Sequence, residues 1–596
     1  MRSFKFILLC FLLSFTARAQ FKVLPLNHGS SIHNLRTKSS DPISLPFFDD
    51  FAGDLTFPDT SIWENSQDVT IRSGIAIDPP TQQVAVLDGT RGNGTFYNSV
   101  PTSNGPTDIL ISKPIDLSLS DPGTVVLSFF YQLGGLGDKP EGESDSLIVQ
   151  FYDSVDSTWS TFSKLEGALI NETDQFFPES ILVPTSYFSE SFQFRFQAHG
   201  KQSGSFDSWL IDYVYLDEGR SLSALDLPDH SLTNTPSSIF RNYGQVRDKS
   251  FFEDPDAYLG ELNFGLNHFF ADPDFSSQSI SFNIEIRDTL SNQILFEEDG
   301  VQVIDYRQIE NIAIPLNDMI DDLQGIDTTI VLETKIFLDS ISSQFNPPYL
   351  SKNDTLKIYN TIGRVMAYDD GSSEFAFGAN LSGTSVAMAY YVAQPDLIQS
   401  LSINFTRIGR PVAGANMRIT VWKDLERSES SVINAITVAA NPASIIDGFQ
   451  TYPLFAAVSD TFYVGYTQLT DGFVPVGLDE NNDHGDKVWI STGTGFFRAE
   501  DLTGSLMMRV TFSDETITSS EKSLRQTFNI YPNPTSDWFR VADEYQEIRL
   551  YNLEGKLQPI KFSEDKILLH HLPEGLYIVT IKHEGIVETK KLVIRR

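Results

Sequence analysis

The stretch Phe528–Pro534, with the sequence FNIYPNP, decides how the end of this 596-residue chain folds. Its first four residues alternate apolar and polar side chains, the pattern of a strand with one buried face. Pro532 and Pro534 follow directly, and a proline lacks the backbone N–H that a sheet ladder needs. The strand must therefore end at Pro532, and the chain must turn there.

Beyond this turn, short β-forming runs alternate with turns up to the last residues. Ile548–Leu553 and Leu576–Ile581 are rich in branched and aromatic side chains, which favour strands. Glu554-Gly555 and Glu584-Gly585 supply turns between such runs. Several short strands at this spacing predict a small antiparallel Ig-like sandwich over residues 526–596.

Three motifs in this tail occur in order: Tyr531–Thr535, Gly575–Tyr577, and Lys591–Val593 followed by two arginines. On these residues the tail resembles the type A C-terminal sorting domain of the type IX secretion system of the Bacteroidetes. One departure is Asp537-Trp538, where members of that family often carry a glycine. The residues that match the motifs are Pro532, Asn533, Pro534, Gly575, Tyr577, Lys591, Leu592 and Val593.

The resemblance implies two partners: the type IX machinery, which would carry the chain across the outer membrane, and surface polysaccharide, to which it would be anchored. The alternative is an ordinary Ig-like sandwich at the end of a secreted chain. Such motif matches are hypotheses until the structural context supports them.

Residues 1–19 have the composition of an export signal. Arg2 and Lys5 precede the apolar run Phe6–Phe15, and Ala17 and Ala19 form a small-x-small cleavage site. The apolar run is too short to anchor the chain in a bilayer, and no other stretch reaches transmembrane length. The expected location is extracellular or on the outer-membrane surface, after passage through the periplasm.

Cys10 is the only cysteine and lies inside this signal, so the cleaved chain would have none. A cysteine-free chain excludes disulfides, thiolate zinc sites and a cysteine nucleophile.

The net charge of −36 comes from 79 acidic and 43 basic residues and is unevenly distributed. Residues 521–596 carry 12 Lys and Arg against 11 Asp and Glu, so the excess of acid lies ahead of them. A body this acidic repels phosphate backbones. Nucleic acid is therefore not an expected partner.

The body of the chain predicts an all-β, multidomain protein of jelly-roll and Ig-like sandwiches. In Phe192–Phe196, for example, three phenylalanines alternate with Gln and Arg, the pattern of a half-buried strand. The predicted boundaries are a linker at 20–44, a jelly roll at 45–217, an Ig-like sandwich at 218–360, a second jelly-roll-like sandwich at 361–512, and a linker at 513–525.

The first of these regions, residues 45–217, resembles MAM-like or choice-of-anchor jelly rolls of exported proteins. The residues that carry the likeness are the opening Phe48–Phe51 and the closing Asp207–Val214.

Clustered oxygens suggest calcium as the one cofactor, because hard cations prefer oxygen ligands. The opening and closing strands of a jelly roll often pair, and such pairing would bring Asp49, Asp50 and Asp212 together. Asp479, Asn481 and Asp483 belong to a single loop, residues 479–486, with the sequence DENNDHGD. The alternative is that these residues are solvated loops and strand-end caps. The candidate ligands are Asp49, Asp50, Asp212, Asp479, Asn481 and Asp483.

The sequence contains no intact catalytic motif. Ser382–Ala389 resembles the nucleophile motif of subtilisin-like proteases, but Asp370, Ser385 and His484 follow one another in the wrong order for that family. We predict instead that Val386–Val392 is a strand. Trp159, Trp422 and Trp489 are candidates for stacking on a ligand, although sandwiches place most aromatic residues in their cores.

These observations favour a non-enzymatic surface protein that binds or adheres to glycan or protein partners. Two alternatives stay open: a surface hydrolase with a carboxylate site in a jelly-roll cleft, and a purely structural surface-layer component. The fold alone does not separate them.

Overall fold

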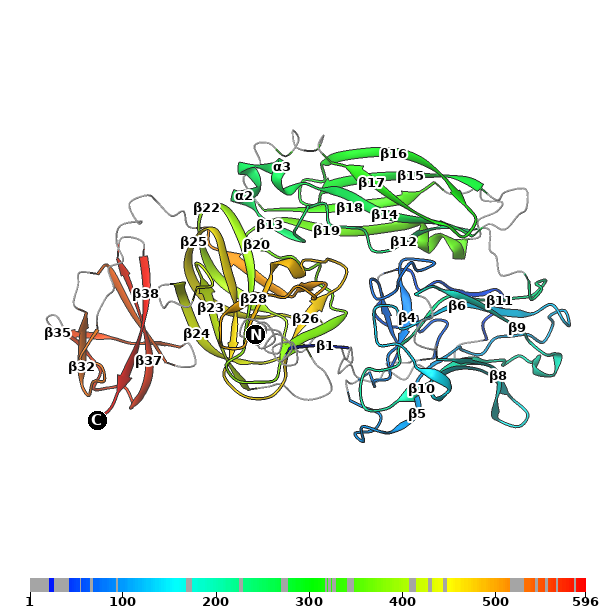
Figure 1. Ribbon diagram of the computed structural model, residues 1–596, viewed down its shortest axis with the longest axis horizontal. Helices are drawn as coiled ribbons and strands as arrows, with labels where there is room; N and C mark the ends of the chain where they lie inside the picture. The colour runs from blue at the N-terminus through cyan, green and yellow to red at the C-terminus, as the bar shows by residue number, and fades with distance from the viewer. Residues whose placement is uncertain are drawn as a thin grey trace, which may run out of the picture. The chain divides into compact units, whose positions relative to one another are not determined.

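The computed structural model describes most of the chain (Figure 1). The described residues are 21–25, 42–53, 55–64, 68–92, 95–167, 174–223, 229–269, 277–316, 319, 323, 329–339, 348–406, 414–426, 431–442, 447–514, 530–541, 545–552, 556–563, 566–583 and 586–596. The predicted signal, with Ala17 and Ala19, lies outside them, as does most of the predicted linker at 513–525.

The chain divides into two compact units, Met1–Thr516 and Ile517–Arg596. Both are built from β-sheets whose strands pair antiparallel, except for Gln245–Arg247, which pairs parallel with residues 361–363. The first unit also contains the short helices α2 (Asp248–Glu253) and α3 (Pro255–Tyr258). The prediction of an all-β chain of sandwiches is confirmed. Within the described ranges, no helix is both long and apolar enough to cross a bilayer.

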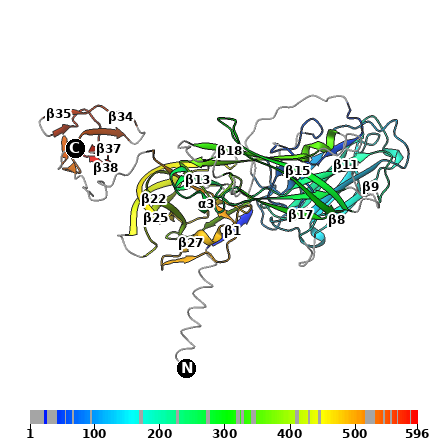
Figure 2. The same ribbon diagram turned by 90° about the horizontal axis from the view of Figure 1, so that it is seen from above.

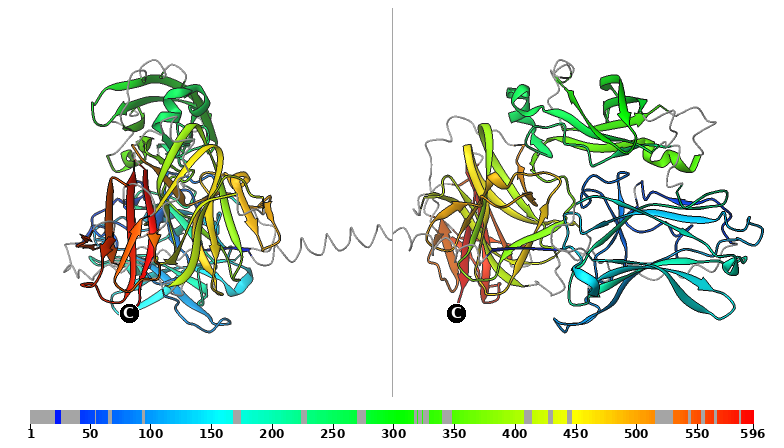
Figure 3. Two further views of the ribbon diagram at one scale, coloured as in Figure 1. Left: turned by 90° about the vertical axis from the view of Figure 1, so that its left-hand side faces the viewer. Right: turned by 45° about the vertical axis from the view of Figure 1, so that its right-hand side comes forward.

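The first sandwich packs two sheets face to face, seen edge-on in the right panel of Figure 3. Phe47 and Phe194 come from opposite sheets and meet with ring centroids 5.2 Å apart, and Trp63 packs against both. The strands, in sheet order, are β5 (Asn104–Ile111), β10 (Phe194–Lys201), β7 (Ser146–Asp153) and β8 (Thr158–Glu166), and β3 (Thr70–Arg72), β4 (Val84–Leu87), β11 (Trp209–Asp217), β6 (Val126–Leu133) and β9 (Phe177–Leu182), with β2 (Phe47–Asp49) beside β11.

The second sandwich covers the middle of the chain. Alternate residues of its strand β18 (Ile330–Leu338) are buried, which matches the period of a strand with one face in the core. Its strands are β12 (His230–Thr233), β14 (Glu261–His268) and β17 (Ile309–Pro315) in one sheet, and β13 (Gln245–Arg247), β19 (Thr355–Gly363), β18 (Ile330–Leu338), β15 (Ser277–Asp288) and β16 (Ile294–Asp305) in the other.

The third sandwich includes a strand from the beginning of the chain. Residues Phe21–Pro25 form β1, which pairs antiparallel with β21, and Phe21 lies opposite Ala379. The other strands are β21 (Phe375–Ala379), β26 (Val474–Asp479) and β29 (Ser505–Leu506), and β20 (Val365–Met366), β30 (Met508–Phe512), β22 (Ser385–Ile403), β25 (Gln450–Gln468), β23 (Ala415–Trp422) and β24 (Val432–Ala440), with β27 (Val488–Ser491) beside β22 and β28 (Phe496–Arg498) beside β27.

The second and third sandwiches share one continuous apolar core. Helix α2 lies against β22, and β13 lies next to β20 (Figure 1). Figure 2 shows this junction from above, with β13 and α3 near β22. At this junction the Arg247 side chain is 1% exposed. Its Nε donates to Asp396 Oδ2 over 2.6 Å, and its Nη2 donates to the Ser513 carbonyl over 2.9 Å. These contacts join the second sandwich to the third.

The described part of the second unit is a small sandwich of eight strands with its own core around Phe539, Leu550, Val579 and Leu592. One sheet contains β31 (Ile530–Tyr531), β32 (Trp538–Val541), β36 (Lys566–Leu568) and β35 (Lys561–Ser563), and the other contains β34 (Leu557–Gln558), β33 (Glu547–Asn552), β37 (Gly575–His583) and β38 (Ile586–Ile594).

We predict that Asp396→Ala lowers the free energy of unfolding of the first unit by about 3 kcal/mol, because it removes the buried partner of the Arg247 charge and leaves only the partly exposed Asp248 as an acidic partner. Urea unfolding followed by tryptophan fluorescence measures the change. The matched control is Glu166→Ala, which breaks the solvent-exposed Lys164–Glu166 pair at 3.2 Å and is expected to change stability by less than about 0.5 kcal/mol. Equal effects of the two substitutions would contradict the role given to Arg247.

Candidate functional site

In the second unit, the residues of the tail motifs meet at the last strand. The Asn533 side chain accepts a hydrogen bond from Val593 N at 2.9 Å and donates one to the Lys591 carbonyl at 2.6 Å. Thr535 N donates to the Val593 carbonyl at 2.9 Å, and Arg595 N donates back to Thr535 O at 2.8 Å. The first motif is therefore joined to the last one by four hydrogen bonds.

The motif residues divide into a buried and an exposed group. Tyr577 and Leu592 are buried, and the Tyr577 hydroxyl donates to the Pro573 carbonyl at 2.9 Å. Gly575 has a φ of 153°, a conformation that residues with side chains rarely adopt. Pro532, Pro534 and Lys591 are exposed. The buried group shapes the end of this sandwich, and the exposed group is available for recognition.

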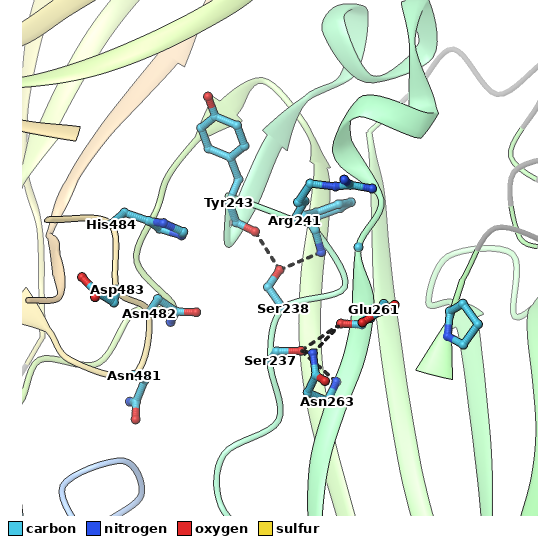
Figure 4. Close-up of a pocket in the computed structure, with 13 residues that line it drawn as sticks. Ser237, Ser238, Arg241, Tyr243, Glu261, Asn263, Asn481, Asn482, Asp483 and His484 are labelled. Carbon is cyan, nitrogen blue, oxygen red and sulfur yellow. Dashed lines mark hydrogen bonds between the residues drawn. The ribbon is translucent and has the colours of Figure 1, made fainter. Parts of the chain in front are cut away.

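In the first unit, a cleft of about 590 Å³ lies between the second and third sandwiches (Figure 4). One wall carries Ser237, Ser238, Arg241, Glu261 and Asn263. The facing wall is the loop Asn481–His484, which follows β26. The two sandwiches that carry these walls share one apolar core.

Part of the cleft is already hydrogen-bonded within the protein. Ser238 Oγ donates to the Tyr243 carbonyl at 2.7 Å, and Asn263 Nδ2 donates to the Glu261 carbonyl at 3.1 Å. Other groups retain capacity: in the described part of the chain, the Glu261 carboxylate and the His484 ring have no hydrogen-bond partner. A cleft with unused donors and acceptors on both walls suits a ligand rich in hydroxyl groups.

The His484 ring is held by aromatic contacts. It lies 5.1 Å from the Tyr368 ring, which stacks on Tyr243 at 4.5 Å. Burial lowers the pKa of His484, so the imidazole is neutral at physiological pH and has one N–H donor and one acceptor nitrogen.

A second group of polar residues lies in the third sandwich. Asp479 accepts from Asp370 N at 2.8 Å and from Asn482 Nδ2 at 2.9 Å, and Glu480 N donates to Glu374 Oε2 at 2.9 Å. Burial, together with the charge of Asp370, raises the pKa of Glu374 to about 8 and that of Asp479 well above its usual range. The cluster is consequently held partly protonated at neutral pH.

The predicted ligand Asn481 belongs to this cluster but presents its amide N–H₂ rather than its oxygen. Asn481 Nδ2 lies 3.3 Å from Asp370 Oδ2 and 3.3 Å from Glu374 Oε1. The third predicted ligand of this loop, Asp483, accepts from Gly485 N at 3.2 Å and Gly504 N at 3.0 Å instead. The loop is thus closed by its own donors.

The acidic residues of the first sandwich are arranged differently. Both carboxylate oxygens of Asp49 are used, by Phe51 N at 3.0 Å and by Trp63 Nε1 at 2.6 Å. Asp212 accepts from Thr81 N at 3.0 Å. Asp50 Oδ1 accepts from Ala52 N at 3.1 Å, but its Oδ2 is buried without any partner. Burial, then the charge of Asp49, raises the pKa of Asp50 to about 7.

The structure thus separates the six predicted calcium ligands into two sandwiches. Asp50 and Asp212 are close enough for the charge of Asp50 to raise the pKa of Asp212 after burial does. Among the residues described, no three His, Cys, Asp or Glu side chains gather in the manner of a metal site. Sequence reasoning missed Glu374 as a member of the second group, because it lies far from Asp479 in the chain and has no motif.

Ser385 is the first residue of strand β22, and its hydroxyl lies 2.8 Å from the Thr467 hydroxyl on β25. The prediction of a strand over Val386–Val392 is confirmed, and the protease-like motif has no structural support.

Comparison with known proteins supports one of these sites. Residues 529–595 match the family described as the secretion system C-terminal sorting domain. No curated protein matches the chain. The tail motifs and their structure therefore identify a protein that the type IX machinery exports to the cell surface or the extracellular space.

Solved structures give only distant similarities. They include the glycoside hydrolase domain of Endo-D from Streptococcus pneumoniae R6, with 9% identity, TM-score 0.19, and coverage of 54% of this chain and 44% of that one. A putative beta-galactosidase from Bacteroides fragilis has 7% identity, TM-score 0.18 and coverage of 44% and 35%. The tandem CBM22 domains from Paenibacillus barcinonensis have 9% identity, TM-score 0.14 and coverage of 72% and 98%.

This chain spans less than half of the length of the first two of these proteins. At such TM-scores the superpositions carry no information about function, which has to be argued from the chain's own residues.

We predict that Asn533→Ala reduces the amount of protein at the cell surface, because it removes two hydrogen bonds that join the first motif to β38. Each such bond stabilises by about 1 kcal/mol. Immunoblots of periplasmic and surface fractions measure the distribution. The control is Ser536→Ala, an exposed neighbour whose hydroxyl, among the residues the structure describes, bonds only to Asp537. Normal export of the Asn533 variant would show that this joint is dispensable.

Proposed function

We propose that this exported surface protein is a non-enzymatic binding protein, and that it holds a glycan in the cleft between its second and third sandwiches. The observation that carries the proposal is the polar lining of that cleft, which combines amides, hydroxyls, a guanidinium, a carboxylate and a neutral imidazole. Sugar hydroxyls both donate and accept hydrogen bonds, so a mixed lining of this kind suits them better than a lining of one charge.

Rigidity supports the same ligand class. Binding costs conformational entropy whenever a site has to be ordered, and a site built on two fused sandwiches avoids most of that cost. The walls are joined through the shared core and the buried Arg247–Asp396 pair. A preformed cleft is therefore available to a weakly binding ligand such as an oligosaccharide.

The carboxylates of the cleft favour binding over hydrolysis. Glu261 is exposed on one wall, and Asp483 on the other wall is committed to two backbone N–H groups. A glycosidase needs one carboxyl group to donate a proton and a second to act as base or nucleophile. Asp483 in its present contacts acts as a loop cap instead.

We predict that replacing His484 and Asn482 with alanine weakens glycan binding by about 10-fold or more, since each lost hydrogen bond costs about 3- to 10-fold in affinity. Glycan-array screening followed by calorimetry on the full chain measures it. Tyr359→Ala is the control, an exposed aromatic substitution on β19 outside the cleft. Binding that is unchanged in the double variant, or absent for every glycan tested, would overturn the cleft assignment.

We also propose that calcium, if it is bound, is held in the first sandwich by Asp50 and Asp212. The support is Asp50 Oδ2, a fully buried acceptor without a donor, since such an atom is costly unless a cation or a proton satisfies it. In the third sandwich both carboxylate oxygens of Asp479 accept N–H groups, whereas Asp50 Oδ2 accepts none.

We predict that millimolar calcium raises the melting temperature of the full chain and that EDTA lowers it. The shift should disappear in Asp50→Asn, which removes the charge but keeps the shape of the side chain. Differential scanning fluorimetry with calcium, magnesium and EDTA makes the comparison. Asp483→Asn serves as the control and should retain the shift. A shift that survives in Asp50→Asn would place the ion elsewhere.

A further inference from the structure

The outer face of the first sandwich carries a cluster of aromatic and polar side chains on β7, β8 and β10. Tyr152 and Trp159 lie opposite each other on β7 and β8, with ring centroids 5.2 Å apart. The Arg195 guanidinium, from β10, lies over the Trp159 ring at 4.4 Å. We name this cluster, with Gln150 and Thr161, the Arg195 platform.

Strand alternation explains why these residues face outward. Phe151 on β7 and Phe194 and Phe196 on β10 are fully buried in the core of the sandwich. Their neighbours Tyr152 and Arg195 therefore project from the opposite face of the sheet. Tyr152, Trp159 and Arg195 are each partly exposed, so the platform is accessible to a ligand.

The guanidinium of Arg195 is held in position before any ligand arrives. Its Nε donates to Gln150 Oε1 at 2.7 Å, and Gln150 Nε2 donates to Thr161 Oγ1 at 3.2 Å. The Trp159 ring supports the guanidinium plane from one side. Within the described residues, neither Nη atom of Arg195 has an acceptor, so this edge of the fork is unused.

The charge of Arg195 is also unbalanced, which is unusual in a chain with 79 acidic and 43 basic residues. No carboxylate in the described ranges pairs with it. Burial alone lowers the pKa of Arg195, with no acidic group nearby to oppose the effect. A partly buried cation without a counter-charge is costly, and a carboxylate supplied by a ligand would offset that cost.

We propose that the Arg195 platform binds the uronic acid residues of an acidic polysaccharide. The carboxylate of the sugar would accept two parallel hydrogen bonds from the guanidinium fork, which matches its planar geometry. The apolar face of the pyranose ring would lie against Tyr152, and its hydroxyls would reach Gln150 and Thr161. The inference rests on the proposed function for the class of ligand, but it concerns a separate surface.

The third sandwich carries a similar group of one tryptophan, one tyrosine and one arginine. The Trp489 and Tyr463 rings there are 6.2 Å apart, and the Arg498 guanidinium lies 5.5 Å from Trp489. Arg498 has no acidic partner among the described residues either. Two such surfaces on one chain would strengthen attachment to a repeating polymer through multivalency.

The general repulsion between an acidic protein and an acidic polymer does not exclude this contact. At physiological ionic strength, charges more than about 8 Å apart are largely screened. The attraction of one guanidinium with direct hydrogen bonds therefore outweighs distant carboxylates, and binding should weaken as salt is added.

The test is calorimetric titration of the full chain with oligogalacturonate, a neutral galactan of similar length and a poly-glutamate peptide. We expect binding to oligogalacturonate that falls at least about 10-fold in Arg195→Gln and in Trp159→Ala, with a smaller fall in Arg195→Lys, which keeps the charge but loses the fork. The matched control is Arg91→Gln, because Arg91 lies over Tyr97 at the same 4.4 Å; its affinity should not change.

Thermal unfolding of each variant separates lost binding from lost folding, and Arg195→Lys supports the proposal only if it folds as the wild type does. Equal affinity of the wild type and Arg195→Gln, no binding of oligogalacturonate, or platform-dependent binding of poly-glutamate alone would each overturn the proposal.

The cleft variant of His484 and Asn482 distinguishes this inference from the proposed function. If neutral glycans bind through the cleft while oligogalacturonate does not bind, the platform proposal fails and the cleft remains. If oligogalacturonate binds through Arg195 and no glycan responds to the cleft variant, the cleft proposal fails and the platform proposal remains.

Discussion

The buried guanidinium of Arg247 is the polar contact that joins the second sandwich to the third. It is shared between Asp248, Asp396 and the Ser513 carbonyl, and it lies over the Phe512 ring at 5.3 Å. A charge removed from water in this way is tolerable only if its partners stay in place. The Arg247 contacts therefore join the second and third sandwiches, which also share one apolar core, and the cleft lies between them.

Burial also determines the pKa values of several carboxyl groups in this protein. Asp50 is buried beside Asp49 in the first sandwich, and Glu374 is buried near Asp479 in the third, and desolvation raises the pKa of each. Protonation or a bound cation relieves the repulsion between them. The opposite case is Arg195, a cation without an acid beside it, which is why its surroundings point to an external anion.

The sorting unit shows how a sequence motif relates to a structure. Asn533 and Thr535 are distant from Lys591 and Val593 in the chain, yet they are neighbours across the edge of β38. Part of the motif is thus explained by the folding of the small sandwich. The exposed members, Pro532, Pro534 and Lys591, have no such structural requirement in it, which is consistent with their being read by the export machinery.

Alternation of apolar residues, as in Phe192–Phe196, was sufficient to predict strands and an all-β chain, because the side-chain period of a strand is a local property. The tail motifs were sufficient to predict export because each motif is also a local feature of the sequence. The sites were not predictable in this way. Glu374 accepts from Glu480 N, Ser238 faces His484, and Arg195 covers Trp159 only after strands from distant parts of the chain become neighbours. A strand pattern states which side chains are buried but not which strand lies beside them, so tertiary packing alone decided the cleft, the acidic clusters and the platform.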